Sequence, residues 1–199
     1  MASHLREDDP VTDPARYYDL EGYLFGEVSA RSRSTGQLSA FDFFCIVIGK
    51  ANRAKSKVAK RLPGRGCADL PMAVQALTRS VASAQSHKAR LRGLVEDWGF
   101  RLPMASAILA VPYPDDFTVY DVRVCDVLDD FQDARNRTRF EDLWARYAAY
   151  AKRVQASVPD AATLRDRDRH LRDKSFRAPL EGDSEGAFGV ATDDREREA

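Results

Sequence analysis

The sequence predicts an all-α fold, and three observations lead to that prediction. Apolar residues recur at spacings of three and four through most of the chain, which is the period of amphipathic helices. Glycine and proline gather in short breaks such as "PGRGCADLP" (63–71), as expected of turns between helices. Runs in which apolar and polar residues alternate, as they do in strands, are hard to identify, and no internal repeat is visible. We therefore expect about eight helices around one hydrophobic core.

The helices are expected in a definite order along the chain. Their ranges are 17–28, 39–62, 72–82, 87–98, 104–111, 121–131, 139–155 and 161–176. Ser39 is predicted to cap the second helix, with Asp42 three positions on as a capping box. Residues 31–40, "RSRSTGQLSA", are expected to be a linker. Gly99 is expected to end the fourth helix in a tight turn, "GFRLP".

Composition divides the chain into three parts. The first sixteen residues are polar and are expected to form a flexible N-terminal arm, with a helical domain over 17–178. The segment 179–199 contains mostly small and acidic residues, and it is expected to be a disordered acidic tail.

The formal net charge of 0 conceals an uneven distribution of charge. Residues 181–199 carry seven acidic and two basic side chains, so residues 1–180 have a net charge of +5. Between Lys50 and Arg92 there are eleven Lys and Arg and a single acid, Asp69. Such a segment suits binding to phosphates, with release of counterions. A solvated, non-binding helix face is the alternative.

The spacing of the cysteines and the shortness of the apolar runs argue against a disulfide-rich, metal-binding or membrane-spanning protein. The cysteines Cys45, Cys67 and Cys125 show no CxxC spacing, so neither a metal site nor a disulfide framework is expected. No run of apolar residues approaches the length of about 18 that a membrane-spanning helix needs, and "MASHLREDDP" does not resemble a secretory signal. We expect a protein of the cytoplasm with no membrane partner.

One acid lies in an unusual setting. Asp121 interrupts "FTVYDVRVC" (117–125), an otherwise apolar and β-branched run. Aspartate is a preferred N-cap because its carboxylate accepts hydrogen bonds from free N–H groups of the first turn. A carboxylate in apolar surroundings can also do chemistry on a sugar. Capping and catalysis are compatible, and the residue type alone does not choose between them.

The order of elements over 88–131 resembles the helix-hairpin-helix DNA glycosylase superfamily, which includes endonuclease III and the adenine and 8-oxoguanine glycosylases. The small-residue helix of that family is matched by "ASAIL" (105–109). Asp121, twelve positions after Leu109, matches the catalytic aspartate, and Val124, Val127 and Leu128 match apolar positions of the helix that follows. The resemblance implies a two-lobed helical domain in which 88–131 holds the hairpin and the catalytic region.

A second stretch, "AFDFFCIVIGKAN" (40–52), is similar to an early helix of the same family. The resemblance places Asn52 where a Gln or Asn intrudes into DNA at the position of the removed base. The basic residues around it, Lys50, Arg53, Lys55 and Lys57, would then hold the DNA backbone. Alternatively, Asn52 is an ordinary polar residue and the basic side chains form a solubilising face.

The chain departs from the family pattern at the hairpin. Gly99 matches the first hairpin glycine, but Arg101 stands where the second glycine is usual. A glycine there lets backbone N–H groups approach a phosphate; Arg101 could bind the phosphate with its side chain instead. Pro103 occupies the position of the Schiff-base lysine of bifunctional members, which implies a monofunctional enzyme. The iron–sulfur cysteines of some members are absent, so no metal or other cofactor is expected.

The resemblance implies a monomeric enzyme that flips a damaged or modified base out of double-stranded DNA and hydrolyses its N-glycosidic bond. The base could be a lesion, in DNA repair, or a modified base of foreign DNA, in defence against phage. Possible stacking groups for the base are Tyr17, Tyr18, Tyr23, Phe44 and Trp98, each of which could equally be core. Two further hypotheses are a non-catalytic helix-hairpin-helix DNA-binding module and a helical protein-interaction domain.

Overall fold

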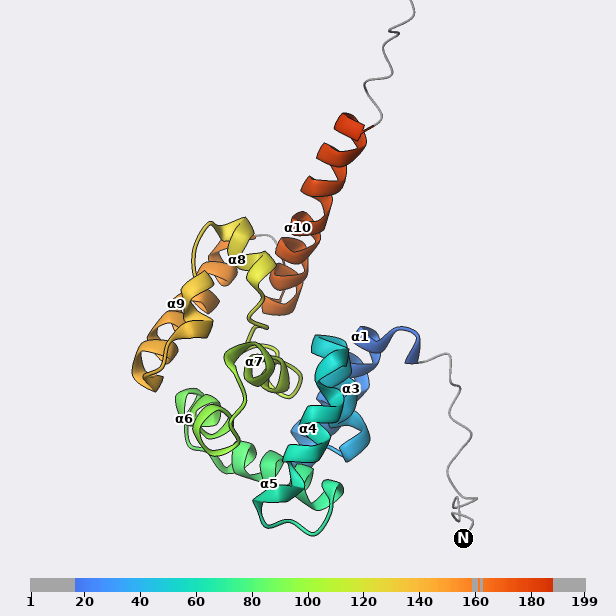
Figure 1. Ribbon diagram of the computed structural model, residues 1–199, viewed down its shortest axis with the longest axis vertical. Helices are drawn as coiled ribbons and strands as arrows, with labels where there is room; N and C mark the ends of the chain where they lie inside the picture. The colour runs from blue at the N-terminus through green and yellow to red at the C-terminus, as the bar shows by residue number, and fades with distance from the viewer. Residues whose placement is uncertain (1–16, 159–160, 162, 188–199) are drawn as a thin grey trace, which may run out of the picture. The chain divides into compact units, whose positions relative to one another are not determined.

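All regular elements are helical in residues 17–158, 161 and 163–187, which the computed structural model describes (Figure 1). The predicted all-α class is therefore confirmed for that part of the chain. The predicted arm, residues 1–16, lies outside the described residues. Contacts divide the chain into two compact units, which meet in sequence between Asp116 and Phe117.

The first unit contains all elements through α7. They are α1 (Leu20–Gly22), η2 (Tyr23–Val28), α2 (Ser29–Thr35), α3 (Ala40–Ala51), η3 (Asn52–Ala54), α4 (Lys55–Arg61), η4 (Pro63–Arg65), α5 (Leu70–Ser83), α6 (His87–Arg92), η5 (Gly93–Asp97) and α7 (Leu102–Ala110). Its centre is the packing of α3 on α7, where Phe43, Val47, Ala105 and Leu109 are fully buried.

Ser39 caps α3 as predicted, whereas the Asp42 side chain, expected to complete a capping box, belongs to a buried polar cluster. Ser39 Oγ accepts a hydrogen bond from the Asp42 N–H at 3.0 Å. The buried Asp42 carboxylate accepts from the Tyr23 hydroxyl at 2.6 Å and from Arg31 at 2.8 Å. Burial by itself would raise the pKa of Asp42, but the hydrogen bonds from Tyr23 and Arg31 outweigh it and lower that pKa. Burial and the neighbouring Asp42 raise the pKa of Tyr23 to about 12.

Two segments of the first unit differ from the prediction. The expected linker is helical through Thr35; the Ser34 and Thr35 hydroxyls both donate to the Arg31 carbonyl, and Gly36 ends α2 with a φ of 68°. The expected helix over 39–62 is broken at Ala51, which has a φ of −159° and a ψ of 85°.

The second unit begins with an extended segment, residues 117–121. Four elements follow: α8 (Val122–Leu128), η6 (Gln132–Asn136), α9 (Phe140–Ser157) and α10 (Leu164–Ala187). Both α8 and α9 pack against α10. The core includes Phe117, Tyr120, Tyr147, Tyr150 and Leu171.

Two boundaries in the second unit also differ from the prediction. Helix α8 ends at Leu128, and Phe131, expected on the same helix, lies beyond it with a φ of 77°. Helix α10 continues past residue 178 to Ala187, so the expected tail is helical over 179–187, where Arg177 pairs with Glu181 one turn away. The rest of that tail, 188–199, lies outside the described residues.

Candidate functional site

The turn between η5 and α7 has the tight geometry that the sequence predicted. Gly99 adopts a φ of 66°, a left-handed conformation that costs any residue with a Cβ. The Phe100 N–H donates to the Leu94 carbonyl at 2.9 Å, and the Phe100 side chain is buried. Helix, glycine turn and helix thus follow one another over 87–110.

Arg101 lies at the solvent side of this turn. Its side chain is exposed and its backbone is the N-cap of α7. Pro103 in the first turn of α7 has no N–H, and the first N–H groups of any helix lack an intrahelical acceptor. The positive end of the α7 dipole and the Arg101 guanidinium are therefore at one end of the same short helix.

Arg61 connects α4 to the turn. Its Nη1 donates to the Gly99 carbonyl oxygen at 2.9 Å. Its guanidinium carbon lies 4.8 Å from the centre of the Phe100 ring, within the range of a cation–π interaction. The basic helix α4 and the glycine turn, 38 positions apart in sequence, are thereby neighbours. In the sequence, only its place in the basic run marks Arg61.

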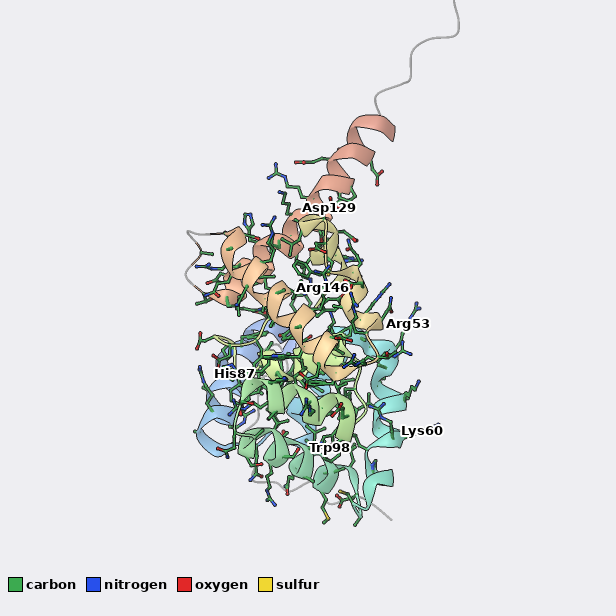
Figure 2. All side chains as sticks on the ribbon, turned by 90° about the vertical axis from the view of Figure 1, so that its left-hand side faces the viewer. Arg53, Lys60, His87, Trp98, Asp129 and Arg146 are labelled. Carbon is green, nitrogen blue, oxygen red and sulfur yellow. The ribbon has the colours of Figure 1, made fainter. Side chains whose placement is uncertain are left out.

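Asn52 and the surrounding basic side chains form an exposed group at the break between α3 and α4. Asn52, Arg53, Lys55 and Lys57 are exposed, and Lys50 is half-buried. Figure 2 shows the labelled side chains of Arg53 and Lys60 on the same edge of the first unit. Asn52 therefore begins the short 3-10 helix η3 in an exposed position, which differs from the regular α-helix position expected from the unbroken pattern.

Asp121 opens α8 as an N-cap. Its φ of −135° and ψ of 130° are those of extended backbone, and its Oδ1 accepts a hydrogen bond from the Arg123 N–H at 3.0 Å. The side chain is half-buried. The capping interpretation of Asp121 is confirmed, and the catalytic one stays a prediction.

Buried tyrosines fix the extended segment that leads to Asp121. From α9, the Tyr147 hydroxyl donates to the Thr118 carbonyl at 2.8 Å, and the Tyr150 hydroxyl donates to the Val119 carbonyl at 3.1 Å. From the segment itself, the Tyr120 hydroxyl donates to the Phe131 carbonyl at 2.7 Å. Burial raises the pKa of all three hydroxyls, so they remain protonated donors even above the pH at which an exposed tyrosine ionises. Nothing in the sequence distinguishes these tyrosines from ordinary core residues, whether on α9 (Tyr147 and Tyr150) or in the segment itself (Tyr120).

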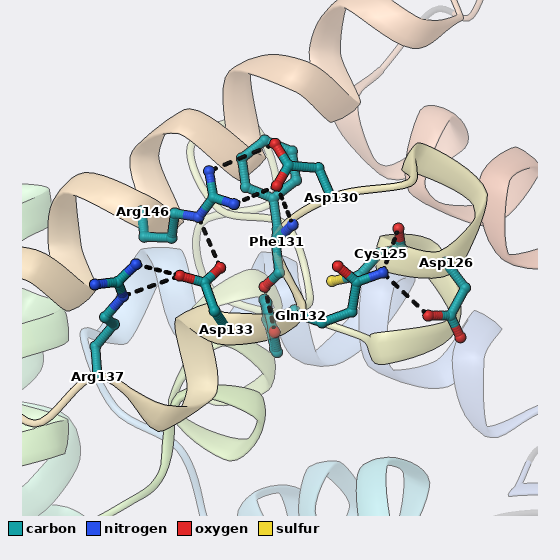
Figure 3. A network of polar contacts seen from close by, with 9 residues as sticks. Cys125, Asp126, Asp130, Phe131, Gln132, Asp133, Arg137 and Arg146 are labelled. Atoms are coloured by element: carbon teal, nitrogen blue, oxygen red, sulfur yellow. Dashed lines mark hydrogen bonds and ion pairs between the residues drawn. The ribbon is translucent and has the colours of Figure 1, made fainter.

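A charged network holds the loop after α8 (Figure 3). Arg146 of α9 donates to Asp133 at 2.8 Å and also pairs with Asp130. Its guanidinium carbon lies 4.5 Å from the centre of the Phe131 ring. Hydrogen bonds from Arg146 and Arg137 lower the pKa of Asp133. These contacts stabilise the positive φ of Phe131, whose carbonyl oxygen accepts the hydrogen bond from the Tyr120 hydroxyl.

Two of the possible stacking residues and two of the three cysteines are buried. Tyr23 is bound to Asp42, and Trp98 Nε1 donates to Ser80 Oγ at 3.1 Å, so these two rings belong to the core. Cys45 and Cys125 are buried, and burial raises the pKa of Cys125 to about 11.

The predicted site residues fall into two groups. The seven predicted DNA-binding residues belong to the first unit, where Arg61 joins the α4 region to the turn; Asp121 belongs to the second unit. None of the helices in the described residues is long and apolar enough to cross a membrane. Within the same residues, no three His, Cys, Asp or Glu side chains are grouped as a metal ion would require.

No protein-family model, curated protein sequence or solved structure matches the chain.

Proposed function

We propose that this protein is a monofunctional DNA N-glycosylase in which Asp121 is the catalytic carboxylate. The observation that carries the proposal is the setting of Asp121: a half-buried acid at the start of α8, preceded by a segment that two buried tyrosine hydroxyls hold. A fixed carboxylate stabilises developing positive charge without the cost of reorganising solvent. The glycine turn followed by the small-residue helix α7 is the second feature in its favour.

The reaction is a hydrolysis. The base leaves C1′ of the deoxyribose with the bonding electron pair and is protonated, and positive charge builds on the sugar. Asp121 stabilises that charge, orients a water molecule and accepts its proton as the water oxygen bonds to C1′. The base must first leave the helix stack, at a cost of a few kcal/mol. Asn52, which is exposed, is proposed to occupy the space that the base vacates.

The proposed DNA-binding surface consists of the basic group around Asn52 and the glycine turn. Lys50, Arg53, Lys55 and Lys57 would neutralise phosphates, and Arg101 with the N-terminus of α7 would hold another. Because each neutralised phosphate releases counterions, the affinity for duplex DNA should fall linearly on a log–log plot against salt.

The first test is formation of abasic sites. Purified wild-type protein and Asp121→Asn are incubated with duplexes that each carry one lesion or modified base, and the DNA is then treated with hot alkali. Asparagine keeps the shape and the capping ability of aspartate but has no negative charge. We expect alkali-dependent strand breaks with the wild type on at least one substrate, and none with Asp121→Asn.

Other outcomes are equally informative. Breaks without alkali would contradict the monofunctional proposal, which rests on Pro103 in place of a lysine. An Asp121→Asn variant as active as the wild type would remove Asp121 from the mechanism.

A non-catalytic DNA-binding module is the second candidate. It is favoured by the hydrogen bond from the Arg123 N–H, which gives the Asp121 carboxylate a structural role that needs no chemistry. This candidate predicts salt-sensitive DNA binding by wild type and Asp121→Asn alike, and no excision from any substrate.

A further inference from the structure

Helix α3 presents a second apolar face, which the core does not use. Phe41 is 55% exposed and Ile48 is 39% exposed, and Phe44 between them is half-buried. Residues seven apart lie on the same face of a helix, and Phe44 is next to that line. We refer to Phe41, Phe44 and Ile48 as the α3 stripe.

Aromatic side chains from the start of the described chain extend the stripe. The Tyr17 ring meets the Phe41 ring edge-to-face, with their centres 5.3 Å apart. Tyr18, the next residue in sequence, is 98% exposed. Exposed apolar side chains on one helix face, unlike single scattered apolar residues, indicate a binding surface.

The surroundings of the stripe decide which partner suits it. Its C-terminal end reaches the break at Ala51, next to the exposed Asn52 and Arg53 and the half-buried Lys50. The run from Lys50 to Arg61 contains six basic side chains and no acid. Proteins bind unpaired nucleic-acid strands by combining aromatic rings with nearby cations. The bases stack on the rings, and the phosphates contact the cations.

The length of the stripe agrees with this partner. Phe41 and Ile48 are separated by seven residues, which is a rise of about 10 Å along the helix. That distance corresponds to about three stacked nucleotides at 3.4 Å each. A second copy of the chain would need no such row of cations at one end.

We propose that the α3 stripe stacks the bases of an unpaired DNA segment whose phosphates contact Lys50 and Arg53. The proposal rests on the proposed function in taking DNA as the partner, and it goes further in naming unpaired nucleotides as the form preferred. Substrates with a single-stranded, bulged or opened region would then be bound more tightly than regular duplex.

The test is binding of a single-stranded 12-mer with a central 2-aminopurine, and of the same sequence fully paired. Phe41→Ala should bind the single strand about tenfold more weakly, as expected for the loss of one stacking ring, with duplex affinity unchanged. Phe41→Tyr, which keeps a ring, should restore binding. Met72→Ala is the matched control, since Met72 is 52% exposed on α5. The wild type should quench 2-aminopurine fluorescence, and Phe41→Ala should quench it less.

Each alternative outcome has a distinct meaning. Equal single-strand affinity of wild type and Phe41→Ala would overturn the stacking proposal while duplex binding stands. A Phe41→Ala variant that changes the sedimentation coefficient of the DNA-free protein would assign the stripe to contact between copies, and also overturn it. Absence of any DNA binding would overturn both proposals. Stripe-dependent binding without excision of any base would leave the stripe in place and remove the glycosylase.

Discussion

The hydroxyl of Tyr147 donates to the backbone carbonyl of Thr118 at 2.8 Å, across 29 positions of sequence. Both residues are buried, so the carbonyl depends on this tyrosine for its hydrogen bond. The contact attaches the segment before Asp121 to the middle of α9, and with it the start of α8.

Replacing Tyr147 by phenylalanine should destabilise the second unit. The ring still fills its place, but the Thr118 carbonyl loses its donor, which costs about 1–3 kcal/mol for a buried group. Urea denaturation followed by Trp144 fluorescence, in a Trp98→Phe background, reports on this unit because each unit contains one of the two tryptophans. Tyr18→Phe is the control, since Tyr18 is 98% exposed; an equal loss in both variants would contradict the prediction.

Substitutions at Asp121 should separate its capping role from its charge. Asp121→Ala removes the acceptor for the Arg123 N–H and should lower the free energy of unfolding by about 1 kcal/mol, whereas Asp121→Asn and Asp121→Ser keep a capping side chain and should stay within about 0.5 kcal/mol of the wild type. All three should lose excision activity. Activity that survives in Asp121→Ser would show that capping alone is required.

Alanine at Gly99 should weaken DNA binding through the backbone of the turn. A Cβ at a φ of 66° costs about 1–2 kcal/mol and should disturb the turn that Arg61 contacts. Gly66→Ala is the matched control, because Gly66 also has a positive φ, of 81°, and has nothing within 4 Å of an added Cβ. Both variants should lose stability, measured by thermal unfolding. Only Gly99→Ala should bind duplex DNA more weakly; equal affinities would exclude the turn from the interface.

The first unit should lose stability in alkali because of Tyr23. Its pKa is raised from 10.0 to about 12 in the folded protein, chiefly by burial. Above pH 10 the unfolded chain therefore releases this proton more readily than the folded one, so the free energy of unfolding falls between about pH 10 and 12. Tyr23→Phe should make stability less dependent on pH in that range. Urea denaturation at pH 9, 10 and 11 of wild type and variant measures the difference, and parallel curves would contradict the assignment to Tyr23.

Local features were predictable from the sequence because each depends on residues close together in the chain. The all-α class follows from the periodicity of apolar residues, and the turn follows from Gly99. The Ser39 and Asp121 caps were predictable because each side chain accepts a hydrogen bond from an N–H group two or three positions further along the chain. The resemblance to the glycosylases added roles for Asn52 and Asp121, which stay predictions.

Only the tertiary structure decided the features that depend on distant partners. The helix break at Ala51 follows a strong local helix pattern, and the contact of Arg61 with Gly99 joins residues 38 positions apart. Tyr147 and Tyr150 read as ordinary core residues until their hydroxyls meet the carbonyls of the segment before Asp121. Exposure of the α3 stripe was equally hidden, because the sequence marks a residue as apolar, whereas packing of the other helices decides which apolar face is covered.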